Sequence, residues 1–315
     1  MGIDVTRKGM IGGLAHLKTG ISVVPYADSL DRARELVRIA DETGLDYVGI
    51  QDHPYQARFL DTFTLIAALL PQTSRISFFT DVANLPLRGP AMIAKALASM
   101  DVLSGGRVEL GLGAGAFLEQ AASLGGPRRS RGGSVDALDE AIEVIRLLWS
   151  GERKVSFAGR HYTLEEAHPG PQPAHPIEIW LGAFGPRMQR LTARKADGWV
   201  PSLGVLSPEQ LKEGNERIDA AAEQAGRDPS QIRRVLNLQG AIGKGSAAPA
   251  RLPVGYLAGE PLIGPPELWV DALDGFAADG FDTFIFWPID PAPEQVNAFA
   301  GEVVQPLTTS ASMRG

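Results

Sequence analysis

The chain has 315 residues, 44% of them hydrophobic and 21% charged, so it is long enough to bury a large core and has an ordinary globular composition. A net charge of -7 argues against a general binder of nucleic acid or of anionic membranes, because basic groups are not in excess. The chain contains no cysteine, which excludes disulfides, thiolate nucleophiles and cysteine-ligated metal sites.

In the first half of the chain, short apolar runs typical of strands alternate with segments of helical periodicity. The first strand, at 21–24, is closed by Pro25, and the first helix begins at Ser29 and ends near Gly44. The following strands are expected at 47–50, 76–82 and 108–112, and the helices between and after them at 61–70, 90–103 and 134–149.

The alternation pauses twice in the second half. Residues 154–176 read as an insertion, with a hairpin around Gly159 and a proline-rich crossing after it, and residues 243–264 read as an irregular loop. Around these segments, strands are expected at 177–181, 199–200, 235–241 and 283–286, and helices at 186–195, 208–225, 265–278 and 291–305.

Eight strands, each followed by a helix, favour a closed (β/α)8 TIM barrel over an open doubly wound sheet. We therefore expect an α/β fold with one domain over residues 1–315, an insertion after the fourth helix and an irregular loop before the seventh. Residues 1–18 are expected to form an N-terminal extension, and residues 306–315 a frayed tail. In such barrels the reactive groups follow the strands, at the C-terminal mouth.

Asp52 and His53 follow the second strand. An Asp-His pair at this place suits acid/base catalysis or contact with a cofactor heterocycle, and the alternative is that Asp52 caps the loop while His53 packs. Asp81 follows an apolar strand and must find partners or touch a ligand, unless it is the satisfied carboxylate of a bulge.

Glycine-rich loops follow the fourth and fifth strands. Gly113, Ala114 and Gly115 do not fit the spacing of a dinucleotide fingerprint, and we expect them to let the backbone approach a flat ligand or to pack tightly at the mouth. The later loop runs into a helix with proline in its first turn, where exposed N–H groups favour a phosphate or carboxylate. Its candidate binding residues are Gly182, Ala183, Phe184, Gly185 and Arg187.

Three evenly spaced histidines, His161, His168 and His175, lie in the proline-rich insertion. No helix aligns their side chains, so we expect no metal site. No apolar run is long enough to cross a membrane, and the N-terminal stretch has no apolar segment typical of a signal peptide. We therefore expect a cytoplasmic enzyme with no membrane or nucleic-acid partner.

An ordered set of motifs resembles the bacterial luciferase-like superfamily. They are Asp52-His53 and the stretches at 60–65 (LDTFTL), 94–107 (AKALASMDVLSGGR), 110–115 (LGLGAG), 180–188 (WLGAFGPRM) and 196–199 (ADGW). The resemblance implies a dimeric TIM-barrel oxidoreductase with a flavin or deazaflavin ring across the mouth. It also implies a non-proline cis peptide at Asp81-Val82, in a bulge that includes Ala83 and supports the ring.

Within this superfamily the chain looks more like the reductases and dehydrogenases that use coenzyme F420, such as the methylene-tetrahydromethanopterin reductase group, than like those that use FMN. The resemblance implies hydride transfer between F420 and a small organic substrate. The alternatives are an FMN-dependent monooxygenase with a partner flavin reductase, and a non-catalytic flavin-binding protein. Ala116 stands where the deazaflavin-dependent sugar-phosphate dehydrogenase has a catalytic carboxylate, so we expect no sugar-phosphate specificity.

Overall fold

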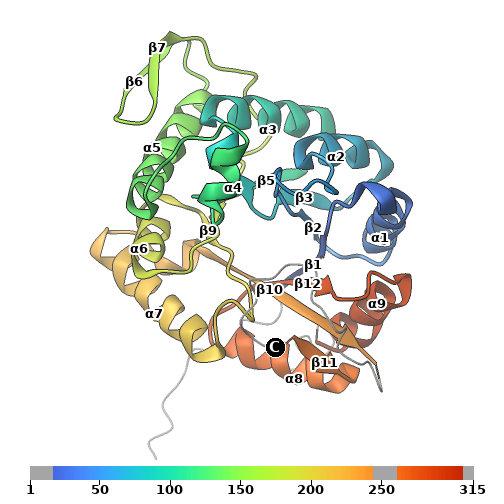
Figure 1. Cartoon of the computed structure of the whole chain (residues 1–315). Helices are drawn as coiled ribbons and strands as arrows, with labels where there is room; N and C mark the ends of the chain where they lie inside the picture. Colours follow the sequence, from blue (N-terminus) through green and yellow to red (C-terminus); the bar gives the residue numbers. More distant parts are fainter. Residues whose placement is uncertain (1–16, 244–260, 308–315) are drawn as a thin grey trace, which may run out of the picture.

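The computed structural model describes residues 17–243 and 261–307. Within them, parallel strands form a closed ring, because the last strand pairs with the first (Figure 1). In ring order the strands are β1 (Lys18–Val23), β2 (Tyr47–Ile50), β3 (Ser77–Thr80), β5 (Val108–Gly113), β8 (Ile179–Leu181), β9 (Gly198–Trp199), β10 (Arg233–Ile242) and β12 (Thr283–Pro288). The predicted (β/α)8 barrel is therefore confirmed.

Helices surround the barrel on its outer side (Figure 1). They are α1 (Leu30–Glu42), α2 (Thr62–Leu69), α3 (Pro90–Ser104), α5 (Arg131–Trp149), α6 (Pro186–Lys195), α7 (Pro208–Gln224), α8 (Pro266–Ala278) and α9 (Pro293–Ala298), and the last runs into a π-helical segment at Phe299–Val304. Short 3-10 turns lie at Ala27–Ser29, Leu70–Gln72, Leu85–Leu87 and Pro229–Gln231. None of the helices in the described ranges has the length and hydropathy needed to span a bilayer.

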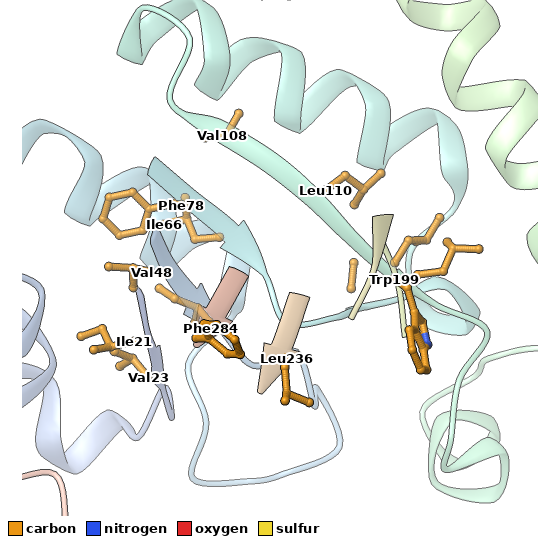
Figure 2. Close-up of a cluster of buried hydrophobic side chains, with 14 of the residues drawn as sticks. Ile21, Val23, Val48, Ile66, Phe78, Val108, Leu110, Trp199, Leu236 and Phe284 are labelled. Carbon is orange, nitrogen blue, oxygen red and sulfur yellow. The ribbon is translucent and has the colours of Figure 1, made fainter. Parts of the chain in front are cut away.

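The two faces of each strand bury different side chains, as the alternation of a parallel barrel requires. On β3, Phe78 points outward into the layer between strands and helices, where it belongs to the same apolar cluster as Val48 of β2 and Phe284 of β12 (Figure 2). Phe79, the next residue, points inward and packs with Trp180 at a ring-centroid distance of 5.1 Å. The outward-facing side chains of the strands therefore pack against the helices, and the inward-facing side chains fill the barrel interior.

Aromatic side chains close the lower part of the barrel interior, and glycines on the neighbouring strands make room for them. A Cβ on Gly49 would lie 2.6 Å from Cζ of Phe79, and one on Gly198 would lie 2.5 Å from Cδ1 of Trp180. Real Cβ atoms do not approach so closely, so these two positions need glycine. These buried side chains fill the barrel interior below its C-terminal mouth.

The structure differs from the sequence-based expectations at several boundaries. The predicted strand at 76–82 ends at Thr80, and after the bulge the chain forms a separate strand, β4 (Ala83–Asn84), which pairs with β5. A short helix, α4 (Leu118–Ser123), was missed because only Ala121 of its residues is buried and the apolar pattern is weak. The predicted hairpin of the insertion is present as β6 (Val155–Ala158) and β7 (Thr163–Ala167).

Most of the irregular loop predicted at 243–264 lies outside the described residues. Its end is not irregular, because β11 (Leu262–Gly264) pairs in parallel with the extended end of β10. Lys18, expected in the N-terminal extension, begins β1 because its backbone N–H bonds to Asp282 and β1 pairs with β12. Leu307, expected in the frayed tail, continues the last helix and is 4% exposed.

His175 in the insertion makes an ion-paired cluster that predicts a pH dependence of stability. Its Nδ1 lies 2.8 Å from Asp101 and its Nε2 lies 3.2 Å from Glu109. The hydrogen bond to Glu109, together with the charges of both carboxylates, raises the pKa of His175 to about 9, from 6.5. The stabilisation is complete below pH 6.5 and is lost as the pH rises through about 9.

We therefore expect the free energy of unfolding to fall by roughly 3 kcal/mol between pH 6.5 and 9, since one pKa unit corresponds to about 1.4 kcal/mol. His175→Gln should flatten this slope in urea unfolding measured across the range. His168→Gln, at an exposed position in the same insertion, should leave the slope as it is. An equal slope in wild type and His175→Gln would mean that the cluster does not couple protonation to folding.

Candidate active site

A cavity of about 420 Å³ opens at the C-terminal mouth of the barrel. Residues from the loops that follow β2, β3, β5 and β8 line it, as the barrel rule predicts. Of the residues singled out from the sequence, those that line the cavity are Asp52, His53, Asp81, Val82, Ala83, Gly113, Ala114, Gly115, Gly182, Phe184 and Gly185. The structure thus brings together segments more than 130 positions apart in the chain.

Asp52 is held in a buried ion pair. Its side chain is 1% exposed, Arg88 donates to both carboxylate oxygens at 2.9 and 3.0 Å, and the backbone N–H of Asn84 donates to Oδ2 at 2.9 Å. Arg88 also pairs with Asp61, the residue that caps α2. These bonds fix the segment after the bulge against the end of β2.

His53 faces the cavity beside Tyr55, a residue that the sequence reasoning did not single out. His53 Nδ1 and the Tyr55 hydroxyl lie 2.7 Å apart, and Phe117 contacts the imidazole edge-on at a centroid distance of 6.0 Å. Burial lowers the pKa of His53 below 6.5, although the charge of Asp52 opposes this. The imidazole is therefore neutral at pH 7 and able to accept a proton.

Asp81 lies at the base of the cavity, and its peptide bond to Val82 is cis, as the family resemblance implied. Its carboxylate accepts hydrogen bonds from the Ser22 hydroxyl at 3.1 Å and from the Asn237 side-chain amide at 2.9 Å. Burial nevertheless raises the pKa of Asp81 to about 6. The Asp81 carboxyl group therefore titrates near pH 6 at the bottom of the cavity. Its two hydrogen-bond donors, Ser22 and Asn237, lie on β1 and β10.

The glycines after β5 and β8 make room for the bulge itself. A Cβ on Gly113 would lie 2.8 Å from Cγ2 of Val82, and one on Gly182 would lie 3.1 Å from the same atom. Gly115 has a φ of +95°, and a Cβ there would lie 2.5 Å from Cγ of Pro86. The tight-packing alternative that we gave for the loop after the fourth strand therefore accounts for Gly113 and Gly115, which also line the cavity.

Three polar atoms in the cavity wall have no hydrogen-bond partner in the part of the chain that the structure describes. They are Gln51 Oε1, Ser134 Oγ and Asn237 Oδ1, and all three are buried. Buried polar atoms are almost always paired in folded proteins, so a ligand with complementary groups is the expected partner. Gln51 Oε1 and Asn237 Oδ1 are acceptors, and Ser134 Oγ can donate or accept, so the wall can bind complementary polar groups of a ligand.

Two helix N-termini adjoin the cavity, at Gly185 before α6 and at Arg131 and Ser134 in the first turn of α5. Their N–H groups and dipoles suit a phosphate. Arg187, which we expected to supply charge here, does not line the cavity; it pairs with Asp136 and donates to the carbonyl of Gly132. Arg131 is the cation in the wall, and no pattern in the sequence distinguished it from the neighbouring arginines.

Ala183, also expected at the cofactor site, is fully buried behind the wall, where its carbonyl accepts from Trp199 Nε1 at 2.7 Å. The three histidines of the insertion have separate partners: His161 and His175 bond to carboxylates through their backbone N–H groups, and His168 Nδ1 lies 3.1 Å from the carbonyl of Arg153. Among residues 17–243 and 261–307, no group of three or more His, Asp or Glu could hold a metal ion.

The sequence matches the family model described as luciferase-like monooxygenase over residues 10–252. An F420-dependent hydroxymycolic acid dehydrogenase of Mycobacterium tuberculosis is 35% identical over 77% of this chain and 68% of its own length. An F420-dependent glucose-6-phosphate dehydrogenase of Kineococcus radiotolerans is 34% identical over 64% of this chain, and the match covers 60% of that relative, less than two thirds of its length.

Among solved structures, the fold is similar to that of an F420-dependent secondary alcohol dehydrogenase in complex with an F420-acetone adduct. The TM-score is 0.80 at 19% identity, and the alignment covers 93% of this chain and 99% of the other. At this level of identity the likeness concerns the barrel and its connections.

Proposed function

Because the chain belongs to the luciferase-like monooxygenase family, we propose that it is an oxidoreductase that uses coenzyme F420 to move hydride to or from a small organic substrate. The observation that carries the proposal is the mouth cavity, whose lining includes a cis-peptide bulge, a buried carboxylate and side-chain oxygens with no partner among the described residues. The two curated relatives are both named as F420-dependent dehydrogenases, which supports the same cofactor.

Residues of the wall fit the two ends of such a cofactor. Gln51 and Asn237 would face the polar edge of the ring, and Val82 would support its plane. Gly185 and Arg131, at the two helix N-termini, would hold the phosphate. When bound, the deazaflavin supplies a ring carbon that accepts or gives hydride, and the protein contributes position and electrostatics.

The substrate is proposed to react at a carbon that bears a hydroxyl group. Oxidation of such a carbon would break its C–H and O–H bonds; bound F420 would supply the hydride acceptor, and the neutral imidazole of His53 would take the proton. The Tyr55 hydroxyl, 2.7 Å from His53 Nδ1, orients the imidazole ring of His53 and stabilises the imidazolium that forms. Ala116 lines the cavity and offers no carboxylate for this step, so the proton role rests with His53.

Turnover without oxygen tests this proposal against the FMN alternative. In purified protein loaded with oxidised F420, a secondary alcohol should reduce the cofactor under anaerobic conditions. With a 2-deuterated alcohol, the deuterium should be recovered in the cofactor. A reaction that needs oxygen and reduced FMN would instead establish a monooxygenase with a partner reductase. Binding of either cofactor with no reaction across an alcohol and ketone screen would favour a non-catalytic flavin-binding protein.

We also propose that the chain forms a homodimer through the exposed face of α3. Met92 and Leu103 on this helix are 67% and 86% exposed, and Val102 beside them is 49% exposed, more apolar surface than a solvent-facing helix usually carries. A single species of twice the chain mass in light scattering is expected, with Leu103→Glu shifting it towards the monomer. The cytoplasmic location expected from the sequence stays a prediction.

A further inference from the structure

Asp81 is a carboxylate of the mouth cavity that makes no ion pair with any residue in 17–243 or 261–307. Asp52, the other carboxylate in the lining, is paired with Arg88. Asp81 is held by two neutral groups instead, the Ser22 hydroxyl at 3.1 Å and the Asn237 side-chain amide at 2.9 Å. A shielded carboxylate with neutral donors only is readily protonated, because no cation compensates its charge. Both charge states of Asp81 are therefore accessible close to neutral pH.

The charged groups around Asp81 do not decide its protonation. The titratable and charged residues of the surrounding elements are Tyr47, Asp52, His53 and Tyr55 on and after β2, Glu109 on β5, Arg131 on α5 and Arg233 on β10. None of them is a cause of the raised pKa of Asp81, which results from burial opposed by the hydrogen bonds of Asn237 and Ser22. The proton on Asp81 is thus governed by what covers the carboxyl group and by its two donors.

The side-chain amide of Asn237 has a donor end and an acceptor end, and the charge of Asp81 decides which end faces the carboxyl group. An ionised carboxylate only accepts hydrogen bonds, so Asn237 must offer Nδ2 to it. Asn237 Oδ1 is then turned elsewhere, and it is buried without a partner although the residue lines the cavity. A protonated carboxyl group can donate to Oδ1 instead, which turns the amide over and brings Nδ2 to the place of Oδ1.

We propose that Asp81 and Asn237 form a proton-linked pair: a ligand that fills the mouth cavity adds one proton to Asp81, and Asn237 turns its N–H donor towards the ligand in place of its carbonyl. The proton comes from solvent and ends on Asp81 Oδ1, where it gives Asn237 Oδ1 the partner that it lacks. The Ser22 hydroxyl donates to Oδ2 in both states.

F420 as the ligand of this pair rests on the proposed function. The polar edge of a flavin-type ring carries more acceptors than donors, so it pairs better with the turned amide of Asn237. A ring that covers Asp81 also excludes water from the carboxyl group and disfavours its charged form. Both effects favour uptake of the proton when the cofactor binds.

The rotation of Asn237 is measurable in the protein without any ligand. The chain has four asparagines, so nitrogen-15 labelling of asparagine gives four pairs of side-chain N–H signals, and the pair missing in Asn237→Ser belongs to Asn237. As the pH falls through about 6, the carboxylate-bonded N–H signal of this pair should be lost and replaced by one that exchanges faster with water. Asp81→Asn should abolish the change. Asn215 on α7, which donates to the carbonyl of Asp279 at 2.8 Å, is the internal control.

Proton uptake on binding tests the link to the ligand. Calorimetric titration with F420 in buffers of different ionisation enthalpy gives the number of protons bound with the ligand, without turnover. At pH 7 the wild type should take up about one proton more than Asp81→Asn, and between pH 7 and 8 its F420 affinity should fall by up to about tenfold relative to that variant. A proton that F420 itself gains or loses cancels in this comparison. His53→Asn, the matched control in the same cavity, should take up as many protons as wild type.

The outcomes distinguish this inference from the proposed function. Asn237 signals that keep the carboxylate-bonded N–H at low pH, or that change equally in Asp81→Asn, would overturn the proton-linked pair whatever the cofactor. Equal proton uptake in wild type and Asp81→Asn with F420 bound would overturn it too and leave the cofactor assignment intact. Failure of F420 to bind would overturn the proposed function, and the Asn237 signals would then decide the inference alone. Thermal melting identifies a folding defect, and Asp81→Ser replaces Asp81→Asn if that variant does not fold.

Discussion

Replacement of His53 by asparagine is expected to lower kcat by roughly 10²- to 10⁴-fold, the usual contribution of a general acid or base. Asparagine keeps a polar side chain of moderate size but cannot accept the substrate proton. His53 is neutral near pH 7 because burial lowers its pKa, so wild-type activity should fall as the pH drops below 6.5 and the imidazole becomes charged. Single-turnover reduction of F420 by a secondary alcohol, followed by absorbance, gives the rate directly.

Binding provides the control for this variant. His53→Asn should bind F420 within a few-fold of wild type, because the ring edge and phosphate are assigned to other residues. Tyr55→Phe should reduce kcat less than His53→Asn, since it removes only the partner 2.7 Å from Nδ1. Unchanged turnover in His53→Asn would remove the proton-transfer role and make Asp81, a carboxyl group of the same cavity with a pKa raised to about 6, the next candidate.

Replacement of Arg88 by alanine is expected to destabilise the fold by about 3–5 kcal/mol, because it leaves the Asp52 carboxylate buried with no counter-charge. The side chain of Asp52 is 1% exposed, and Arg88 occupies both of its oxygens. The same change frees Asp61, which is far more exposed and can be solvated by water. Urea unfolding at pH 7 measures the loss.

A double variant separates the buried charge from lost packing. Adding Asp52→Asn to Arg88→Ala removes the unpaired charge, so the double variant should recover part of the stability that Arg88→Ala loses. Arg38→Ala, which breaks an exposed pair with Glu42 on α1, is the matched surface control and should change stability by less than about 1 kcal/mol. A loss as small in Arg88→Ala as in Arg38→Ala would show that Asp52 is not held as a buried charge.

The barrel was predictable from the sequence because its evidence is local. Runs such as 47–50 and 177–181 are short, largely apolar and bounded by turn residues or proline, and the helices carry clear start signals, including the capping box of Ser207 and Gln210. The cis bulge at Asp81-Val82 and the family itself were predicted from resemblance, and both are confirmed. Periodicity alone indicates neither of them.

The parts that were missed depend on closure of the barrel. Asn237 meets Asp81 across 156 positions of sequence, and Ser22 meets it across 59, so no local pattern indicates either contact. Arg187 looked suited to a phosphate from its place after Pro186, but its side chain extends towards α5 and pairs with Asp136. Tyr55 could have been found, since a tyrosine two residues after a histidine at a strand end is within reach of its ring.

The central claim, that this cavity binds a deazaflavin, is tested most directly by paired fluorescence titrations of the purified protein with F420 and with FMN at matched concentrations. The account predicts saturable binding of F420 at micromolar concentrations or below, weakened in Asn237→Ala, and FMN binding that is much weaker. Tight binding of FMN with no binding of F420 would contradict the cofactor assignment and direct the search for substrates towards oxygen-dependent reactions.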